Sequence, residues 1–353
     1  MKNKLLVLLI AVSLLIAACG QVAESPTASP STPQTLSVMT HDSFAVSESV
    51  VSAFETNNHV KVQFIASGDA GTSLNKAILS KDNPIADVLY GVDNTLLSRA
   101  LDEDIYEPYA SPLLADIPSQ YQLDSQNRAL PVDWGDVCLN YDIKYFSDHN
   151  LQPPQNLEDL LKPEYKNLLV VENPAISSPG LAFLLTTIGH FGADKYLDYW
   201  QGLVTNNVLV VNDWSTAYYT NFSRWGGDRP ITVSYGSSPP FEVIESTSPD
   251  TVPQTAVITS DGSCFRQIEF VGILRGTNHR DLAEKWIDFM LSSTFQEDMP
   301  LQMYVFPVNS QARLDETFQK FLSIPENPAF VSPDDIAANR EAWINAWTEA
   351  VLR

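Results

Sequence analysis

Basic residues are scarce in this 353-residue sequence. Lysine and arginine together number 21, against 43 aspartates and glutamates, and the formal net charge is −22 at pH 7. This excess of acid argues against nucleic acid and anionic lipid surfaces as partners, because both carry phosphate charges that the protein would repel. A cationic small ligand remains compatible with the composition.

Long apolar runs are also scarce, and none after Ile16 could span a bilayer. Residues 1–18 instead have the pattern of a signal peptide, with two early lysines, an apolar stretch at 5–16 and a small-residue pair before Cys19. The segment 16–19 resembles a bacterial lipobox, in which the cysteine is acylated. Residues 19–34 are rich in Ser, Thr, Pro and Ala, which predicts a lipidated N-terminus followed by a flexible linker. We therefore expect an exported protein held by lipid on the outer face of the cytoplasmic membrane.

Only two further cysteines follow, Cys138 and Cys264. Both adjoin apparent strands, at 136–141 and 264–274, and the compartment outside the cytoplasm is oxidising. We expect a disulfide between neighbouring strands. Two buried free thiols are the alternative.

Catalytic motifs are missing as well. The sequence has no nucleophile elbow, zinc-ligand spacing or phosphate-binding loop, and no cofactor motif. The run His41-Asp42-Ser43 contains the residue types of a hydrolase triad, but side chains of adjacent residues diverge. The sequence predicts that the protein is not an enzyme.

What the sequence does have is a regular alternation of strand and helix patterns from residue 35 onward. Strands are expected at 36–40, 60–66 and 86–90, and helices at 44–55, 72–79 and 94–101. The theme returns after residue 135 and predicts an α/β fold with parallel sheets flanked by helices. The length favours two lobes. Lobe 1 is expected at 35–134 plus about 265–308, and lobe 2 at 135–264 plus about 309–353.

Two aromatic residues, Trp214 and Tyr235, each follow a short β-branched run, at 208–211 and 231–233. They are therefore expected just past strand carboxyl ends, where α/β proteins bind ligands. Packing alone explains such residues equally well. Asp69 lies in a loop between two glycines, with Thr72 expected to cap the next helix. Ser177 is expected to cap a helix, a position that can hold an anion but usually holds water.

Several segments together resemble the thiamine-binding proteins of ABC importers, a family of type II periplasmic binding proteins. The resemblance covers nearly the whole mature chain and is carried by residues 40–44, 86–94, 173–181, 213–218, 234–239 and 340–347. It implies a two-lobed fold in which each lobe is a Rossmann-like sheet flanked by helices. It also implies a monomer that captures thiamine or a thiamine phosphate between the lobes and delivers it to a permease and its ATPase.

The resemblance also implies a set of ligand residues. Four match the family pattern, and four depart from it, with His41 and Phe241 in place of Tyr, Tyr304 in place of Trp and Ala70 in place of Gly. The aromatic residues are expected to face the thiazolium and pyrimidine rings, and the carboxylate to bind the ring amine. The complete expected set is His41, Asp69, Ala70, Ser177, Trp214, Tyr218, Tyr235, Phe241 and Tyr304. Ferric receptors of the same fold use paired tyrosines, so Tyr218-Tyr219 leaves ferric-ion binding as the alternative.

Overall fold

The computed structural model describes residues 34–244, 246 and 252–353 of the chain. The expected signal peptide, Cys19 and nearly all of the expected linker lie outside these residues. Residues Thr35–Arg353 form one compact unit. In the described part of the chain, no helix combines the length and the apolar character needed to cross a membrane.

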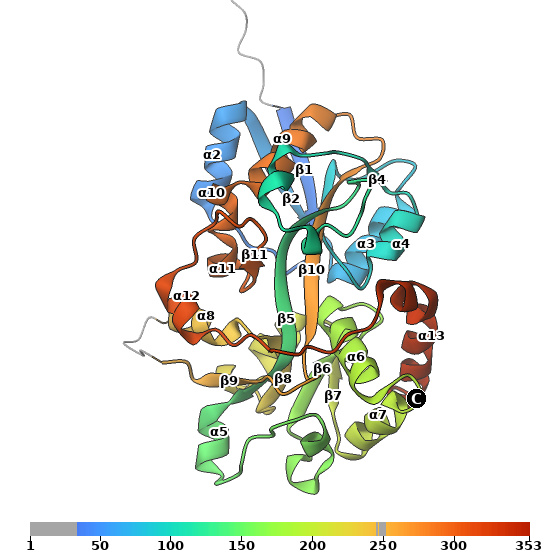
Figure 1. The fold of residues 1–353 in the computed structure, drawn as a ribbon, viewed down its shortest axis with the longest axis vertical. Coiled ribbons are helices and arrows are strands. Elements are labelled where there is room, and N and C mark those ends of the chain that lie inside the picture. The colour runs from blue at the N-terminus through green and yellow to red at the C-terminus, as the bar shows by residue number, and fades with distance from the viewer. Residues whose placement is uncertain (1–33, 245, 247–251) are drawn as a thin grey trace, which may run out of the picture. The chain divides into compact units, whose positions relative to one another are not determined.

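One sheet of eleven described strands runs through this unit (Figure 1). Its main order is β2-β1-β3-β10-β5-β8-β6-β7, with β9 and β11 paired to β5 and β4 paired to β10. We call β2, β1 and β3 the β1 side, and β8, β6 and β7 the β8 side. The strands are β1 Gln34–Thr40, β2 Val60–Ala66, β3 Val88–Asp93, β4 Tyr106–Glu107, β5 Leu130–Asp142, β6 Leu169–Glu172, β7 Leu209–Val211, β8 Ile231–Tyr235, β9 Thr255–Ile258, β10 Phe265–Leu274 and β11 Phe306–Pro307.

The sheet combines parallel and antiparallel pairing, and the parallel pairs lie where the alternation of strands and helices predicted them. Strand β1 pairs in parallel with β3, and β6 pairs in parallel with both β7 and β8. The long central strands β5 and β10 are antiparallel to each other and to the strands beside them. Both run between the β1 side and the β8 side (Figure 1). The lobe boundary expected at residue 134 falls inside β5.

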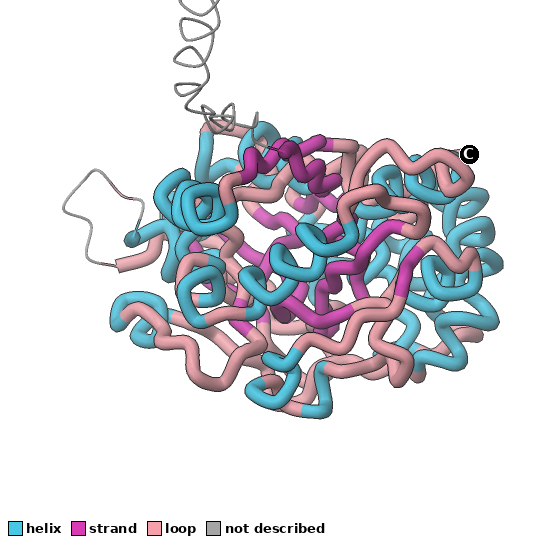
Figure 2. The backbone as a smooth tube through the Cα atoms, turned by 90° about the horizontal axis from the view of Figure 1, so that it is seen from above, coloured by secondary structure: helices cyan, strands magenta, loops and turns pink. Residues whose placement is uncertain are grey.

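Helices surround the sheet, which occupies the middle of the view in Figure 2. They are α2 Glu48–Asn58, α3 Ala70–Leu79, α4 Leu97–Asp102, α5 Ile143–Asp148, α6 Ser178–Phe191, α7 Tyr196–Thr205, α8 Ser238–Ile244, α9 Arg280–Leu291, α10 Ser293–Gln296, α11 Met299–Gln302, α12 Glu316–Phe321 and α13 Pro333–Val351. Single turns of 3₁₀ helix lie at Pro112–Asp116, Ser119–Tyr121, Glu158–Leu161, Pro163–Tyr165 and Ser223–Trp225, and a π-helix at Thr216–Asn221.

Two helix starts show how well local signals predict structure. Helix α13 begins with a local cap, in which the Ser332 side chain accepts a hydrogen bond from the Asp335 N–H. Helix α2 begins at Glu48, later than the expected residue 44. The preceding Ser47 is held instead by Asp298, which accepts hydrogen bonds from its N–H at 2.7 Å and its hydroxyl at 2.5 Å. A tertiary contact therefore overrides the helical pattern of 44–47.

A disulfide joins the two central strands. The register places Phe265 opposite Val137, so Cys264 falls opposite Cys138. The two cysteines form a disulfide with their Cα atoms 4.4 Å apart, and both are fully buried. The cross-link lies where β10 begins, at the end of the pairing that faces the β8 side.

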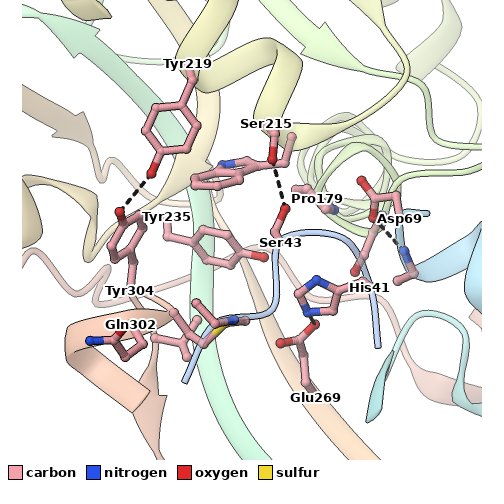
Figure 3. A pocket seen from close by; sticks show the side chains of 16 residues that line it. His41, Ser43, Asp69, Pro179, Ser215, Tyr219, Tyr235, Glu269, Gln302 and Tyr304 are labelled. Carbon is pink, nitrogen blue, oxygen red and sulfur yellow. Dashed lines mark hydrogen bonds and ion pairs between the residues drawn. The ribbon is translucent and has the colours of Figure 1, made fainter. Parts of the chain in front are cut away.

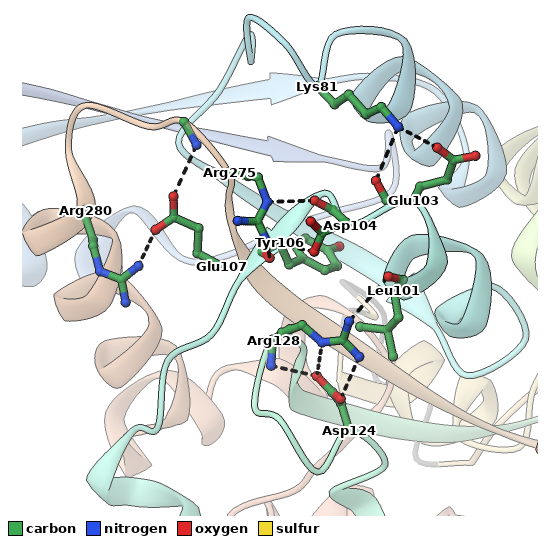
Figure 4. Close-up of polar contacts among 11 residues, drawn as sticks. Lys81, Leu101, Glu103, Asp104, Tyr106, Glu107, Asp124, Arg128, Arg275 and Arg280 are labelled. Carbon is green, nitrogen blue, oxygen red and sulfur yellow. Dashed lines mark hydrogen bonds and ion pairs between the residues drawn. The ribbon is translucent and has the colours of Figure 1, made fainter.

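Ion pairs hold the segment at 102–130 (Figure 4). Arg128 pairs with Asp124 at 3.2 Å, and Arg275 of the segment after β10 pairs with Asp104 at 2.7 Å. Arg280 at the start of α9 pairs with Glu107. These arginines are therefore engaged with acids of the same segment.

Candidate functional site

A cavity of about 200 Å³ lies at the carboxyl ends of strands from both sides of the sheet. Six of the nine expected ligand residues line it. Figure 3 shows four of them, His41, Asp69, Tyr235 and Tyr304, converging from different elements. The six are His41, Asp69, Ala70, Trp214, Tyr235 and Tyr304. The expectation that Trp214 and Tyr235 follow strand ends is correct, since Tyr235 ends β8 and Trp214 follows β7.

Asp69 has a different local role from the expected one. It is itself the N-cap of α3, and its Oδ1 accepts a hydrogen bond from the Ala70 N–H at 2.7 Å. Thr72, the expected cap, lies inside the helix. The same Oδ1 accepts a second bond, at 3.2 Å, from the backbone N–H of Ser178. Asp69 therefore reaches from the β1 side to the start of α6 on the β8 side.

Ser177 caps α6 as expected but does not line the cavity. Its hydroxyl accepts from the Gly180 N–H, and only 2% of the residue is exposed. The next two residues, Ser178 and Pro179, line the cavity in its place. The start of α6 was thus predicted correctly. The Ser177 side chain, which was expected to meet a ligand, instead points to the backbone of the helix as its cap.

The aromatic wall is built in two layers. Trp214 faces the cavity, and its indole N–H donates to the Ser234 hydroxyl at 3.0 Å. Tyr218 lies behind it, with the ring centroids 5.0 Å apart and the planes at 14°. Phe241 packs against Tyr304 with the ring planes tilted by 49°. Tyr218 and Phe241 pack in the aromatic cluster behind the residues that line the cavity.

Tyr219 was not among the expected ligand residues, yet it lines the cavity. Its hydroxyl lies 2.8 Å from that of Tyr304, so the two phenols form one rim (Figure 3). Tyr219 belongs to the π-helix Thr216–Asn221, a rare form that is often found at functional sites. Tyr304 itself adopts φ 59°, an uncommon conformation for a residue with a side chain. Backbone strain of this kind clusters at ligand sites.

Glu269 is the most consequential residue that sequence reasoning missed. It lies on β10, lines the cavity and is only 5% exposed. Tyr90 places its hydroxyl 2.9 Å from Glu269 Oε2 and 2.6 Å from Asp133 Oδ2. A single hydroxyl hydrogen cannot serve both acids, so one carboxyl carries a proton. The signal was present in the sequence, because Glu269 is the one charged residue in the otherwise apolar segment 268–274.

The electrostatics of the cavity favour positive charge in a ligand. Burial raises the pKa values of Asp69 and Glu269, since each lacks a nearby lysine or arginine to stabilise its anion. Burial also lowers the pKa of His41, against the opposing attraction of Asp69 and Asp42. The described residues that line the cavity include no lysine or arginine. The acids of the site therefore lack a protein cation.

No metal site accompanies these acids. In residues 34–244, 246 and 252–353, no three side chains of His, Cys, Asp or Glu are grouped so as to hold a metal ion. The two adjacent tyrosines also diverge, because the Tyr218 hydroxyl bonds to Glu242 while Tyr219 meets Tyr304. Their rings are perpendicular, at 89°. The pair does not present two phenols to one point.

Comparison with known proteins gives a consistent result. The chain is 30% identical over 325 residues to the thiamine-binding periplasmic protein of Escherichia coli K12, covering 90% of this chain and 94% of that protein. The solved structure of a periplasmic thiamin binding protein superposes with a TM-score of 0.80 at 26% identity, covering 92% of this chain and 98% of the other. This confirms the expected mixed α/β fold of periplasmic binding proteins.

A ferric binding protein from Campylobacter jejuni shares the fold with a TM-score of 0.72 at 19% identity, covering 89% of this chain and 99% of the other. At that identity the likeness concerns the fold alone. The model of the family described as bacterial extracellular solute-binding protein matches residues 83–337. Its members bind solutes without catalysis, in agreement with the missing catalytic motifs. On these grounds the chain belongs to the bacterial extracellular solute-binding protein family.

Proposed function

We propose that this protein binds thiamine in the cavity and delivers it to the permease of an ABC importer. The observation that carries the proposal is a buried cavity that combines aromatic faces with acids lacking a protein cation. Thiamine brings a positive thiazolium and a flat aminopyrimidine, which match both features. Each aromatic contact with the cation is worth about 0.5–2 kcal/mol. Trp214, Tyr235 and Tyr304 supply the faces.

Free thiamine fits the site better than its phosphate esters. A helix start such as that of α6 commonly binds phosphate through its open N–H groups. Here the Ser178 N–H already donates to the Asp69 carboxylate. A phosphate at this position would meet a carboxylate instead of open donors. Thiamine monophosphate is therefore the matched competitor for testing the proposal.

The proposed mechanism is closure of two lobes around the ligand. The β1 side with its helices forms lobe 1, the β8 side forms lobe 2, and β5 and β10 form the hinge between them. Two hydrogen bonds linking the sides support this division, namely Asp69 to the Ser178 N–H and the Ser43 hydroxyl to that of Ser215 at 3.2 Å. A ligand that touches both lobes favours the closed form by its higher affinity for it.

Delivery follows from the export signals of the chain. In this proposal, acylated Cys19 anchors a monomer on the outer face of the membrane, and residues 19–34 act as the tether. The closed, loaded form is then presented to the permease and its ATPase. A Cys19→Ser variant should leave the membrane fraction after a salt wash. Retention of that variant on membranes would contradict lipid anchoring.

Native mass spectrometry and calorimetry test the ligand. Protein purified from cells should carry a retained mass equal to that of thiamine, and the stripped protein should bind thiamine more tightly than thiamine monophosphate in titration calorimetry. Failure to bind either compound would overturn the proposal while leaving the fold in place. Tighter binding of the monophosphate would overturn the choice of the free vitamin.

The ferric-ion alternative has less support. Ferric sites use phenolate oxygens, and the Tyr218 hydroxyl is buried against Glu242. Burial and the nearby acids raise the pKa values of Tyr218 and Tyr235 well above the ordinary value. Titration with Fe³⁺ is the direct check, because a ferric tyrosinate complex is coloured. Colour that depends on Tyr219 would favour iron.

A further inference from the structure

His41 and Glu269 both line the cavity, but they do not complete a hydrogen bond to each other. His41 Nε2 lies 3.7 Å from Glu269 Oε1, beyond hydrogen-bond distance (Figure 3). His41 is 8% exposed, and its Nε2 is buried without a hydrogen-bond partner. A buried polar atom left without a partner costs about 1–3 kcal/mol. The gap beside Glu269 is therefore a place where a ligand atom would be stabilising.

We propose that His41 and Glu269 together recognise the amine-bearing edge of a 4-aminopyrimidine by hydrogen bonds. The Nε2–H of His41 donates to the ring nitrogen, and the carboxylate of Glu269 accepts from the neighbouring exocyclic amine. This donor–acceptor pair makes Glu269 a specificity-determining residue. The inference rests on the proposed function and names the part of the ligand that this edge of the cavity selects.

The position of His41 is fixed by its surroundings. Its ring centroid lies 5.6 Å from that of Tyr90. A side chain at Gly91 would collide with the imidazole, so the glycine leaves the space that the ring needs. Burial lowers the pKa of His41, which keeps the ring neutral with one N–H to donate. A fixed, neutral imidazole suits recognition of an uncharged ring nitrogen.

The state of Glu269 follows from the groups packed around it. Tyr90 and Asp133 lie on the side of its Oε2, and Gln267 also forms a hydrogen bond with it. Asp133 is the more deeply buried acid, at 0% exposure, and its pKa is raised well above the ordinary value. Burial raises the pKa of Glu269 as well, but hydrogen bonds with Tyr90, Asp133 and Gln267 oppose this rise and favour the carboxylate form.

The remaining neighbours are acids or phenols and do not neutralise Glu269. The titratable groups Asp93, Asp69, Asp42 and Tyr235 also act on this region. Glu269 Oε1 therefore offers a carboxylate acceptor beside His41 Nε2 at the cavity. In the proposal, an amine that enters there donates a hydrogen bond to this carboxylate.

Oxythiamine is the discriminating probe, because it replaces the amine with a carbonyl and places a hydrogen on the ring nitrogen. The parent protein should bind thiamine roughly 10- to 100-fold more tightly than oxythiamine, the range expected for losing a hydrogen bond to a charged group. In the Glu269→Gln variant, the side-chain amide can donate to the carbonyl. The preference for thiamine should therefore shrink or reverse. A His41→Phe variant should weaken binding of thiamine and leave Glu269 in place.

Glu172→Gln is the matched control. Glu172 is also fully buried with its pKa raised by burial, but it lies outside the cavity. Its variant should keep the parental ratio, and all variants should melt near the parent. If Glu269→Gln retained the parental ratio while binding thiamine, the inference would fall and the proposed function would stand. If the parent bound no thiamine at all, both would fall.

Discussion

Asp69 and Ser178 join two helix starts that come from opposite sides of the sheet. The Asp69 carboxylate caps α3 and also accepts the backbone N–H of Ser178, the first residue of α6. A carboxylate at a helix start is stabilised by the open N–H groups and the positive end of the helix dipole. The Asp69 side chain thus caps a helix, links the two sides of the sheet and places a carboxylate at the cavity.

These roles can be separated by substitution at Asp69. Asparagine caps helices about as well as aspartate, so Asp69→Asn should melt near the parent but lose on the order of 1–3 kcal/mol of thiamine affinity with the charge. Asp69→Ala should also lower stability, by about 0.5–2 kcal/mol, because the cap is lost. Calorimetry and thermal unfolding measure the two effects. Parental affinity in Asp69→Asn would reduce Asp69 to a structural cap.

The second prediction concerns Trp214 as the main aromatic face. Trp214→Ala should lose on the order of 1–3 kcal/mol of thiamine affinity, by analogy with bases stacked on aromatic residues. Trp214→Phe keeps a ring that can stack on Tyr218 and should lose less. Quenching of tryptophan fluorescence by thiamine should also diminish in both variants. Equal affinities in all three proteins would place the ligand elsewhere.

The third prediction concerns the disulfide. The Cys138–Cys264 bond closes a loop with a sequence separation of 126. Replacing both cysteines by alanine should reduce the free energy of unfolding by about 2–5 kcal/mol. Denaturant titration measures the loss, and reductant should affect the parent but not the variant. Two reactive thiols in the unfolded parent without reductant would show that the bond does not form.

Local signals in the sequence predicted some parts of this protein well. Caps, strand ends and the alternation of elements depend on neighbouring residues, so the cap at Ser177 and the placement of Tyr235 could be predicted from short windows. The resemblance to a family singled out six residues that do line the cavity, although they are scattered along the chain. Both kinds of signal are carried by residue types at fixed positions in the sequence.

The missed features depend on contacts between distant segments. The role of Glu269 depends on Tyr90, which lies 179 residues away in the sequence, and on Asp133 of the neighbouring strand β5. Whether Ser177 or Ser178 meets the cavity depends on how α6 docks against Asp69. The antiparallel insertion of β10 between β3 and β5 likewise joins segments far apart in sequence. A linear pattern carries little information about such choices.

The fourth prediction concerns pH. Burial raises the pKa of Asp93 to about 6 from the ordinary 3.8. Between these values the native state holds a proton that the unfolded chain releases, so stability falls as pH rises from about 4 to about 6. Asp93→Asn should remove about 3 kcal/mol of that fall, at roughly 1.4 kcal/mol per pKa unit.

Unfolding measured across this pH range checks the prediction. An amide at position 93 can keep the bonds to Thr95 through its oxygen and to Ser178 through its nitrogen. The exposed Asp194→Asn variant is the control and should follow the parental curve. The raised pKa values of Asp133 and Glu269 also make stability fall as pH rises. The informative quantity is therefore the difference in stability between Asp93→Asn and the parent at each pH. A curve for Asp93→Asn that parallels the parent would contradict the raised pKa.

The last prediction tests closure of the two proposed lobes at a single contact. The Gly71 N–H in α3 donates to the Ile176 carbonyl at 3.1 Å, and a Cβ at Gly71 would lie 2.8 Å from that oxygen. Gly71→Ala should therefore hold the sides apart. Since α3 itself tolerates alanine, the empty protein should keep its stability, while thiamine affinity should fall about 10-fold or more for a steric cost of 1–3 kcal/mol.

Gly202→Ala adds a methyl group in α7 against the flexible Leu161 side chain and serves as the control. Small-angle X-ray scattering should show compaction with thiamine in the parent and the control but not in Gly71→Ala. If Gly71→Ala compacted and bound like the parent, closure would not pass through this contact.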